Sequence, residues 1–284
     1  MRNSDFSWTS TRDIKVYSQI WTPDKKEIKA VICLVHGLGE HSTRYKILPR
    51  ILTEQGYALI AFDLPGHGRS GGKRGHTPDF EAYMENISRL LEEAGRHFPG
   101  KERFLYGHSL GGNLVINYAL RYNPDIKGII TTGPWFRLSH PPADFLQRLA
   151  RWLNGFWPSF RTFNGIRPVY LSHGGVKNVT RERDRYMHPW ISARTYVTAK
   201  ESGQWALDHA GELNYPILIL HGGEDHVTSA DASREFASKV KENCTLKIYE
   251  GLFHEVHNEP RNKEIFEQII EWLNEQVDRK SIVI

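Results

Sequence analysis

The pentapeptide Gly-His-Ser-Leu-Gly at residues 107–111 has the spacing of a nucleophile elbow. In such an elbow a serine lies at a sharp turn between a buried strand and a helix, with its hydroxyl exposed at the edge of the sheet. The apolar run at residues 104–106 predicts the strand, and residues 110–122 have the apolar spacing of a helix. Small residues permit the close approach of strand and helix that this turn requires. We therefore expect Ser109 to be a catalytic nucleophile.

A serine hydroxyl is a weak nucleophile at neutral pH, so Ser109 needs a general base, and an imidazole base needs a carboxylate that fixes its tautomer. When a GxSxG elbow carries the serine, the chain order is serine, acid, histidine. The predicted strand at residues 217–220 is followed by Asp225, and the predicted strand at residues 246–249 is followed by His254. We therefore predict Asp225 as the acid and His254 as the base.

Other residues remain alternatives for both roles. Glu224 and Asp208 are alternative acids, and His257 is an alternative base because it would lie on the same side of a starting helix as His254. The clustered histidines near Asp225 match no standard metal-ligand spacing, and the chain contains no Walker loop. We therefore expect neither a metal ion nor another cofactor.

Attack on a carbonyl also requires two backbone N–H donors directed at the developing oxyanion. The elbow supplies one of them from Leu110, the residue after the nucleophile. The second should follow the predicted strand at residues 31–35, where His-Gly-Leu-Gly-Glu-His at residues 36–41 places Leu38 between two glycines. Each such donor typically lowers the barrier by about 3 kcal/mol. We therefore predict an oxyanion hole formed by Leu38 and Leu110.

Short apolar runs alternate with helix-length segments along most of the chain and predict the elements that position these residues. The runs are typical of strands buried on both faces, and the alternation predicts an α/β fold with a mostly parallel, doubly wound sheet. Residues 6–9 and 15–21 predict an antiparallel hairpin before the first run, and residues 265–277 predict a final amphipathic helix. The predicted central strands are residues 31–35, 58–62, 104–106, 128–130 and 217–220, with helices at residues 80–97 and 110–122 between them.

Residues 134–200 interrupt this alternation and predict an inserted cap, or lid, subdomain. Four of the eight tryptophans and five of the thirteen phenylalanines lie there. Eleven Lys and Arg residues against three Asp and Glu residues give the insertion a net charge of +8, whereas the remainder carries 26 against 30, a net charge of −4. We therefore expect a hydrolytic core made of residues 1–133 and 201–284, with a basic, aromatic cap between them.

One segment of the predicted cap has the pattern of an amphipathic helix. Two interpretations of its apolar face remain open. The face packs on the core and lines an acyl pocket, or it contacts lipid surfaces or anionic substrates. The apolar face comprises Phe145, Leu149, Trp152, Leu153 and Phe156, and the polar face comprises Asp144, Gln147, Arg148, Arg151 and Asn154.

The composition excludes several other classes of protein. A net charge of +4 over 284 residues gives no indication of a nucleic-acid partner. Residues 1–8 lack the apolar core of a signal peptide, and no apolar run approaches the ~18 residues that a membrane span requires. Cys33 and Cys244 lie in or beside apolar runs, which predicts buried free thiols. We therefore expect a soluble, cytoplasmic protein, with contact with membranes only at their surface.

The chain resembles the monoacylglycerol lipase and lysophospholipase family of α/β-hydrolases. The resemblance is carried by His-Gly-Leu-Gly-Glu-His-Ser-Thr-Arg-Tyr at residues 36–45, Asp-Leu-Pro-Gly-His-Gly-Arg-Ser at 63–70, the elbow at 107–112, and Tyr-Glu-Gly at 249–251 before His254. It implies the triad Ser109, Asp225 and His254 with Leu38 and Leu110 as oxyanion donors. It also implies a lid over an acyl-chain tunnel and cofactor-independent hydrolysis of monoacylglycerols, lysophospholipids or simpler esters.

Several activities are compatible with the same triad. We expect a serine hydrolase that cleaves carboxylic esters of lipids through an acyl-enzyme. A general carboxylesterase, a thioesterase, an acyltransferase and a serine peptidase are the alternatives among enzymes, whereas an epoxide hydrolase or dehalogenase would carry aspartate in place of Ser109. A non-catalytic ligand-binding protein of the same fold is the alternative from another class.

Overall fold

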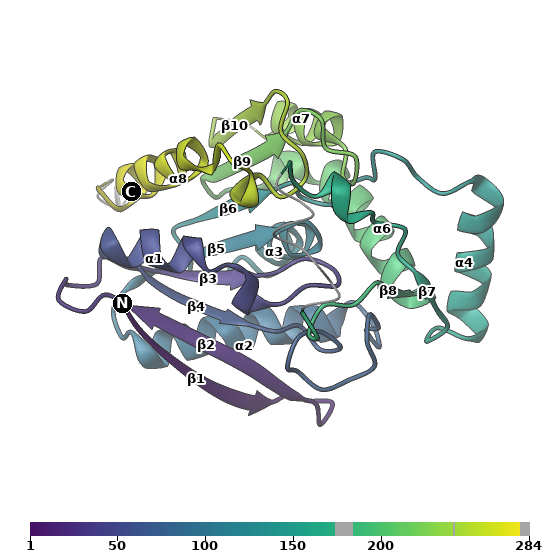
Figure 1. Cartoon of the computed structure of the whole chain (residues 1–284), viewed down its shortest axis with the longest axis horizontal. Coiled ribbons are helices and arrows are strands. Elements are labelled where there is room, and N and C mark those ends of the chain that lie inside the picture. The colour runs from purple at the N-terminus through teal and green to yellow at the C-terminus, as the bar shows by residue number, and fades with distance from the viewer. Residues whose placement is uncertain (174–183, 241, 279–284) are drawn as a thin grey trace.

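The computed structural model describes residues 1–173, 184–240 and 242–278, and its main feature is an eight-stranded sheet (Figure 1). The strands lie in the order β1-β2-β4-β3-β5-β6-β9-β10. The pairs from β4 to β10 are parallel, whereas β2 is antiparallel to both β1 and β4. The strands are β1 (Arg2–Thr9), β2 (Lys15–Thr22), β3 (Ala30–Val35), β4 (Ala58–Phe62), β5 (Glu102–His108), β6 (Gly128–Thr132), β9 (Ile217–Gly222) and β10 (Cys244–Tyr249).

Helices cover both faces of this sheet. Strand β3 shows why, because Ala30, Ile32 and Leu34 contact one apolar cluster while the alternate residues contact another. Helices α1 and α8 pack in the first cluster, and α2, α3, α6 and α7 pack in the second. The helices are α1 (Ile47–Glu54), α2 (Glu81–His97), α3 (Leu110–Tyr122), α4 (Asp144–Phe156), α6 (Ala193–Asp208), α7 (Ala230–Lys239) and α8 (Asn262–Asp278).

These elements confirm the predicted α/β architecture. Every predicted central strand and both predicted helices between them are present within a few residues of the expected bounds. The predicted hairpin is β1 and β2, and the predicted final helix is α8, whose Ile265, Ile269 and Leu273 are buried. Short 3₁₀ helices complete the connections: η1 (Ser42–Arg44), η2 (Pro168–Tyr170), η3 (Ala210–Glu212) and η4 (Val256–Asn258).

The segment predicted as a cap contains α4, the small antiparallel pair β7 (Arg161–Phe163) and β8 (Trp190–Ser192), and the first half of α6. Its residues 174–183 lie outside the described residues. Helix α6 continues past Lys200 and packs on α3, where the Asn113 amide donates to the carbonyl of Ala199 at 2.9 Å. The predicted boundary between cap and core at residue 200 thus falls inside α6, and the division into core and cap stays a prediction.

Helix α4 is present as predicted, but its apolar face does not pack on the core. No residue of α4, which the structure describes completely, is buried. Phe145, Trp152 and Phe156 are 63%, 62% and 77% exposed. Figure 1 shows the helix at the far edge of the molecule, separated from the sheet by α6 and the β7–β8 pair. The interpretation that this face packs on the core was wrong, because α4 packs mainly on α6 and leaves these aromatic side chains exposed.

Among the described residues, no helix combines the length and apolar composition that crossing a membrane requires.

Candidate active site

Ser109 lies at the predicted turn between β5 and α3. Its backbone has φ 53° and ψ −116°, a combination that only a tightly constrained non-glycine residue adopts. The turn requires glycine at two neighbouring positions. A Cβ on Gly111 would lie 2.0 Å from the carbonyl oxygen of Val35. A Cβ on Gly107 would lie 2.4 Å from the carbonyl oxygen of Gly111. The strand-turn-helix geometry expected of a nucleophile elbow is therefore present.

The loop after β3 packs directly against Ser109. A Cβ on Gly37 would lie 3.1 Å from the Cβ of Ser109. The loop is held by Glu40, whose Oε1 accepts the Gly37 N–H at 2.6 Å. The Leu38 N–H donates to no group in the described part of the chain. Leu110 begins α3, so its N–H has no acceptor within the helix. Neither predicted oxyanion donor has a backbone acceptor among the residues that the structure describes.

Asp225 and His254 contact each other, although they come from the loops after different strands, and His254 lines one cavity with Ser109. The Nδ1 of His254 lies 2.7 Å from Oδ2 of Asp225. The other carboxylate oxygen accepts the N–H groups of Val227 at 2.7 Å and Thr228 at 2.9 Å. Because Nδ1 faces a carboxylate, it carries the proton, and Nε2 is left as the atom that can accept one.

Electrostatics favour the ionised acid and a basic imidazole. Burial opposes the ionised form of Asp225, but the His254 and His221 imidazoles and their hydrogen bonds hold its pKa well below the usual value. Burial alone would lower the pKa of His254, but the charge and hydrogen bond of Asp225, together with the charges of Glu255 and Glu40, raise that pKa. This is the pattern expected of a general base that is charged transiently during a reaction.

The alternative residues lie elsewhere. Glu224 and Asp208 are exposed, and the Asp208 carboxylate accepts from Gln204 within α6. His257 stacks on Tyr45 with ring centroids 5.0 Å apart. Burial lowers the pKa of His257 to about 4, despite the opposing charges of nearby glutamates. No hydrogen bond joins His257 to Asp225 within the described residues.

Sequence reasoning missed a buried ionic cluster beneath the oxyanion loop. The Arg44 guanidinium binds both carboxylate oxygens of Glu255 at 2.9 Å and one of Glu40 at 2.8 Å. Tyr45 donates to the same Glu40 oxygen that holds Gly37, at 2.7 Å. Burial disfavours ionisation of Glu40, but the positive charges around it, with Arg44 contributing most, together lower the pKa of Glu40 to about 2. The Glu-His-Ser-Thr-Arg-Tyr stretch at residues 40–45 was the available signal.

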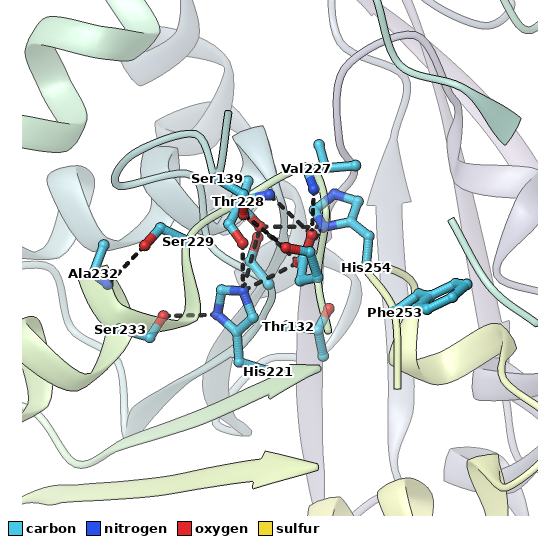
Figure 2. A network of polar contacts seen from close by, with 12 residues as sticks. Thr132, Ser139, His221, Val227, Thr228, Ser229, Ala232, Ser233, Phe253 and His254 are labelled. Atoms are coloured by element: carbon cyan, nitrogen blue, oxygen red, sulfur yellow. Dashed lines mark hydrogen bonds and ion pairs between the residues drawn. The ribbon is translucent and has the colours of Figure 1, made fainter. Parts of the chain in front are cut away.

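Two further residues of the acid loop were also missed. The Thr228 hydroxyl lies 2.8 Å from Oδ2 of Asp225 and 3.0 Å from the carbonyl oxygen of Gly133. The Nε2 of His221 lies 3.1 Å from the same Asp225 oxygen. Figure 2 shows His221 and His254 approaching Thr228 from different sides. A histidine four residues before the acid, at the end of a strand, was the only signal in the sequence.

Two cavities lie near these residues. One has a volume of about 20 Å³, which is room for about one water molecule. Its lining includes Ser109, Leu38 and His254, and the apolar side chains of Ile166, Leu171 and Met187. The other, of about 320 Å³, lies among α4, β7, β8 and α6 and is lined mainly by apolar side chains. Asn164 lines the larger cavity and lies beside Gly39 of the oxyanion loop, so the two cavities are neighbours.

Among the described residues, no group of three or more His, Cys, Asp and Glu side chains is arranged to hold a metal ion.

Comparison with known proteins agrees with this geometry. Residues 26–261 match the family model described as serine aminopeptidase, S33. The crystal structure of Paleococcus ferrophilus monoacylglycerol lipase superposes with a TM-score of 0.84 at 33% identity, over 92% of this chain and 99% of that one. The monoacylglycerol lipase of Mycolicibacterium smegmatis is 29% identical over 95% of this chain and 96% of its own.

An uncharacterised abhydrolase domain-containing protein of Dictyostelium discoideum is 33% identical over 91% of this chain, but the chain spans only 27% of that protein's length. The family model covers most of this chain, and the two lipases match it over nearly their whole lengths. These two findings assign the chain to a family. The chain belongs to the serine hydrolase family described as serine aminopeptidase, S33, among the ester hydrolases of the monoacylglycerol lipase type.

Proposed function

We propose that this protein hydrolyses monoacylglycerols and related single-chain lipid esters, with Ser109 as nucleophile, His254 as base, Asp225 as acid, and the N–H groups of Leu38 and Leu110 as oxyanion donors. The observation that carries the proposal is the 2.7 Å contact of His254 Nδ1 with Asp225 Oδ2, behind the cavity that His254 and Ser109 both line. The names of the similar lipases support the choice of substrate.

In the acylation step, His254 Nε2 accepts the Ser109 hydroxyl proton as the serine oxygen attacks the ester carbonyl carbon. The negative charge that develops on the carbonyl oxygen is stabilised by the N–H groups of Leu38 and Leu110. His254 then donates its proton to the departing alcohol, which leaves an acyl-serine. Water repeats the sequence in deacylation: His254 takes its proton as the water oxygen bonds to the acyl carbon, and the bond between that carbon and the Ser109 oxygen then breaks. His254 returns the proton to Ser109 as the fatty acid leaves.

We also propose that residues 134–200 form a cap and that its 320 Å³ cavity takes the acyl chain. Cavities that bind small molecules are typically ≈300–1,000 Å³ and mainly apolar, and this one meets both criteria. Its proximity to Gly39 would direct the chain towards Ser109. Leu146, Leu149 and Leu153 of α4 contribute to its lining.

The exposed face of α4 supports contact between this cap and lipid surfaces. Phe145, Trp152 and Phe156 project from the helix, and Trp157 and Phe163 beside it are 53% and 66% exposed. Residues 134–200 carry a net charge of +8, with eleven basic against three acidic residues, which would attract anionic lipids. We propose that α4 rests in the lipid interface, so that an acyl chain enters the cavity without crossing water.

We also infer a cytoplasmic location, which the two cysteines support. Cys33 and Cys244 are both free, and burial raises the pKa of their thiols, to about 12 and about 11. Thiols remain free in a reducing compartment such as the cytoplasm, and a buried thiol with a raised pKa is unreactive there.

Labelling with a fluorophosphonate probe tests the catalytic assignment. We expect the parent to be labelled at Ser109 and the Ser109→Ala variant to be unlabelled, with a loss of ester hydrolysis of about 10⁶-fold. Monoacylglycerols, lysophospholipids, acyl thioesters and p-nitrophenyl esters of graded chain length then define the substrate. A folded parent that neither reacts with the probe nor cleaves any of these esters would contradict the proposal.

A further inference from the structure

We propose that His221 is a positioning residue of the catalytic triad, whose Nε2–H holds the Asp225 carboxylate and limits the negative charge that it presents to His254. This inference rests on the proposed roles of Asp225 and His254. It assigns a function to a fully buried imidazole that the hydrolytic steps above leave unused.

The geometry places His221 and His254 on one carboxylate oxygen. Oδ2 of Asp225 lies 3.1 Å from Nε2 of His221 and 2.7 Å from Nδ1 of His254. His221 comes from the end of β9, whereas His254 follows β10, and the two strands are parallel neighbours in the sheet. The acid therefore lies between two imidazoles that approach it from different elements, as Figure 2 shows for His221 and His254 around Thr228.

The partners of His221 determine which of its nitrogen atoms carries a proton. Nε2 faces two acceptors, the Asp225 carboxylate and the backbone carbonyl oxygen of Thr228, both at 3.1 Å. It also lies 3.4 Å from the Thr228 hydroxyl, but that hydroxyl has closer acceptors in Asp225 Oδ2 and the Gly133 carbonyl oxygen. The two acceptors have no proton to donate, so Nε2 must be the donor whether the ring is neutral or charged. Nδ1 lies 2.8 Å from the hydroxyl of Ser233, which donates to it when the ring is neutral. The ring is thus held in one tautomer and one orientation.

The hydrogen bond from His221 to Oδ2 of Asp225 should limit the rise in the pKa of His254. The His221 N–H withdraws charge from the same oxygen that stabilises the His254 imidazolium. Without it, the carboxylate would attract that imidazolium more strongly, and the pKa of His254 would rise further. The carboxylate would also lose one of the contacts that fix its plane, so His254 would be held less accurately. Both effects require His221 to touch Asp225 rather than merely to fill space.

Other charged and titratable groups face His254 and must stay constant in a test. His108 lies on β5 with its ring centroid 4.8 Å from that of His254. Glu255 and His257 follow His254 in the chain, and Glu40 acts on it from the oxyanion loop, where Arg44 pairs with both glutamates. None of these groups contacts His221 within the described residues, so a substitution of His221 leaves them in place.

The test compares three variants by the pH dependence of kcat/KM for a non-ionising ester. His221→Phe keeps a ring of similar size but removes the donor, and we expect its acid limb to move to higher pH by about half a unit, with a plateau roughly 10-fold lower. His221→Gln retains an N–H donor and should restore the parent's limb. Ser233→Ala is the matched control, because it removes a partner of Nδ1 only and should leave the limb unmoved.

A folded His221→Phe protein whose acid limb coincides with that of the parent would overturn the inference. Should this variant not fold, ¹⁵N NMR of the parent's histidines decides: the inference requires a proton on Nε2 of His221, and a spectrum with the proton on Nδ1 alone would refute it. Failure of the proposed function is separate, because it would appear as a parent that neither hydrolyses the ester nor reacts with a fluorophosphonate, whatever the tautomer of His221.

Discussion

The Nδ1 atom of His254 lies 2.7 Å from Oδ2 of Asp225, and both side chains are buried. A carboxylate in that position has two consequences for the imidazole. It leaves Nε2 free to accept a proton, and it stabilises the charged ring that results.

The pH dependence of kcat/KM should show an acid limb that reports His254. Burial lowers the pKa of His254, but the nearby carboxylates, Asp225 foremost, raise it by more, so the midpoint of the limb should lie above the pKa of about 6.5 of an unperturbed histidine. At pH values below that pKa, kcat/KM should fall tenfold per pH unit as Nε2 becomes protonated. Asp225→Asn removes the carboxylate and should lower kcat by about 10⁴-fold. A limb at or below pH ~6 would contradict the proposed pair.

Gly133→Ala should reduce activity through a steric effect on the same pair. A Cβ on Gly133 would lie 3.1 Å from Nδ1 of His254 and 3.3 Å from Oδ2 of Asp225. Displacement of catalytic groups by a few tenths of an ångström to 1 Å typically costs up to about 10²-fold, and we expect a loss of that order in kcat.

Gly100→Ala is the matched control for this variant. Both glycines have positive φ, 51° and 73°, so both substitutions impose backbone strain of order 1 kcal/mol. A Cβ on Gly100 would meet nothing among the described residues within 4 Å. Its kcat should equal that of the parent, and equal losses in the two variants would show that strain alone is responsible.

Stability should fall as the pH drops below about 6.5, because several histidines, His108 and His257 among them, are buried in the neutral form. Burial and the neighbouring histidines lower the pKa of His108 to about 3, and burial lowers that of His257 to about 4. Between these values and about 6.5 the unfolded chain binds a proton that the folded chain does not. Each histidine should therefore reduce the free energy of unfolding by about 1.4 kcal/mol per pH unit as the pH falls.

Urea denaturation at several values between pH 7 and pH 5 measures this slope. His257→Gln should reduce it by one proton's contribution. A slope that is the same in parent and variant would show that His257 is accessible to protons in the folded state.

Arg44→Met should destabilise the protein by about 3–5 kcal/mol, because it leaves two buried carboxylates without a cation. Glu40 and Glu255 are both almost fully buried, and Arg44 supplies their charge-assisted hydrogen bonds. Thermal unfolding measures the loss. Replacing Glu40 and Glu255 by glutamine in the Arg44→Met background should recover part of it, and no recovery would show that the cluster is stabilised mainly by packing.

The proposed contact of α4 with lipid predicts a difference between soluble and vesicle-bound substrates. Trp152→Ser with Phe156→Ser should lower hydrolysis in anionic vesicles at least 10-fold and leave a soluble short-chain ester unaffected, because burial of each aromatic side chain stabilises binding by ~2 kcal/mol. Arg148→Glu with Arg151→Glu should act in the same direction and more strongly at low salt. All four side chains are exposed, so the melting temperature should not change. Equal activity of variants and parent on vesicles would exclude the contact.

The sequence by itself determined the features that depend on local spacing. The turn at Ser109 and the order of Ser109, Asp225 and His254 could be read from short motifs that follow apolar runs. These runs predicted the strands correctly, because a strand buried on both faces needs consecutive apolar residues. The parallel sheet then requires that the loops after β5, β9 and β10 meet at one edge.

Only the tertiary structure decided the contacts between residues that are distant in the chain. Arg44 and Glu255 are separated by 211 positions, and no local pattern pairs them. His221 lies four residues before Asp225, but its contact with that acid depends on how the loop after β9 folds back over the strand. The exposure of α4 was likewise undetermined, because an apolar helical stripe looks the same whether a core or a lipid surface covers it. Periodicity reports which residues share a face, whereas three-dimensional packing decides what that face meets.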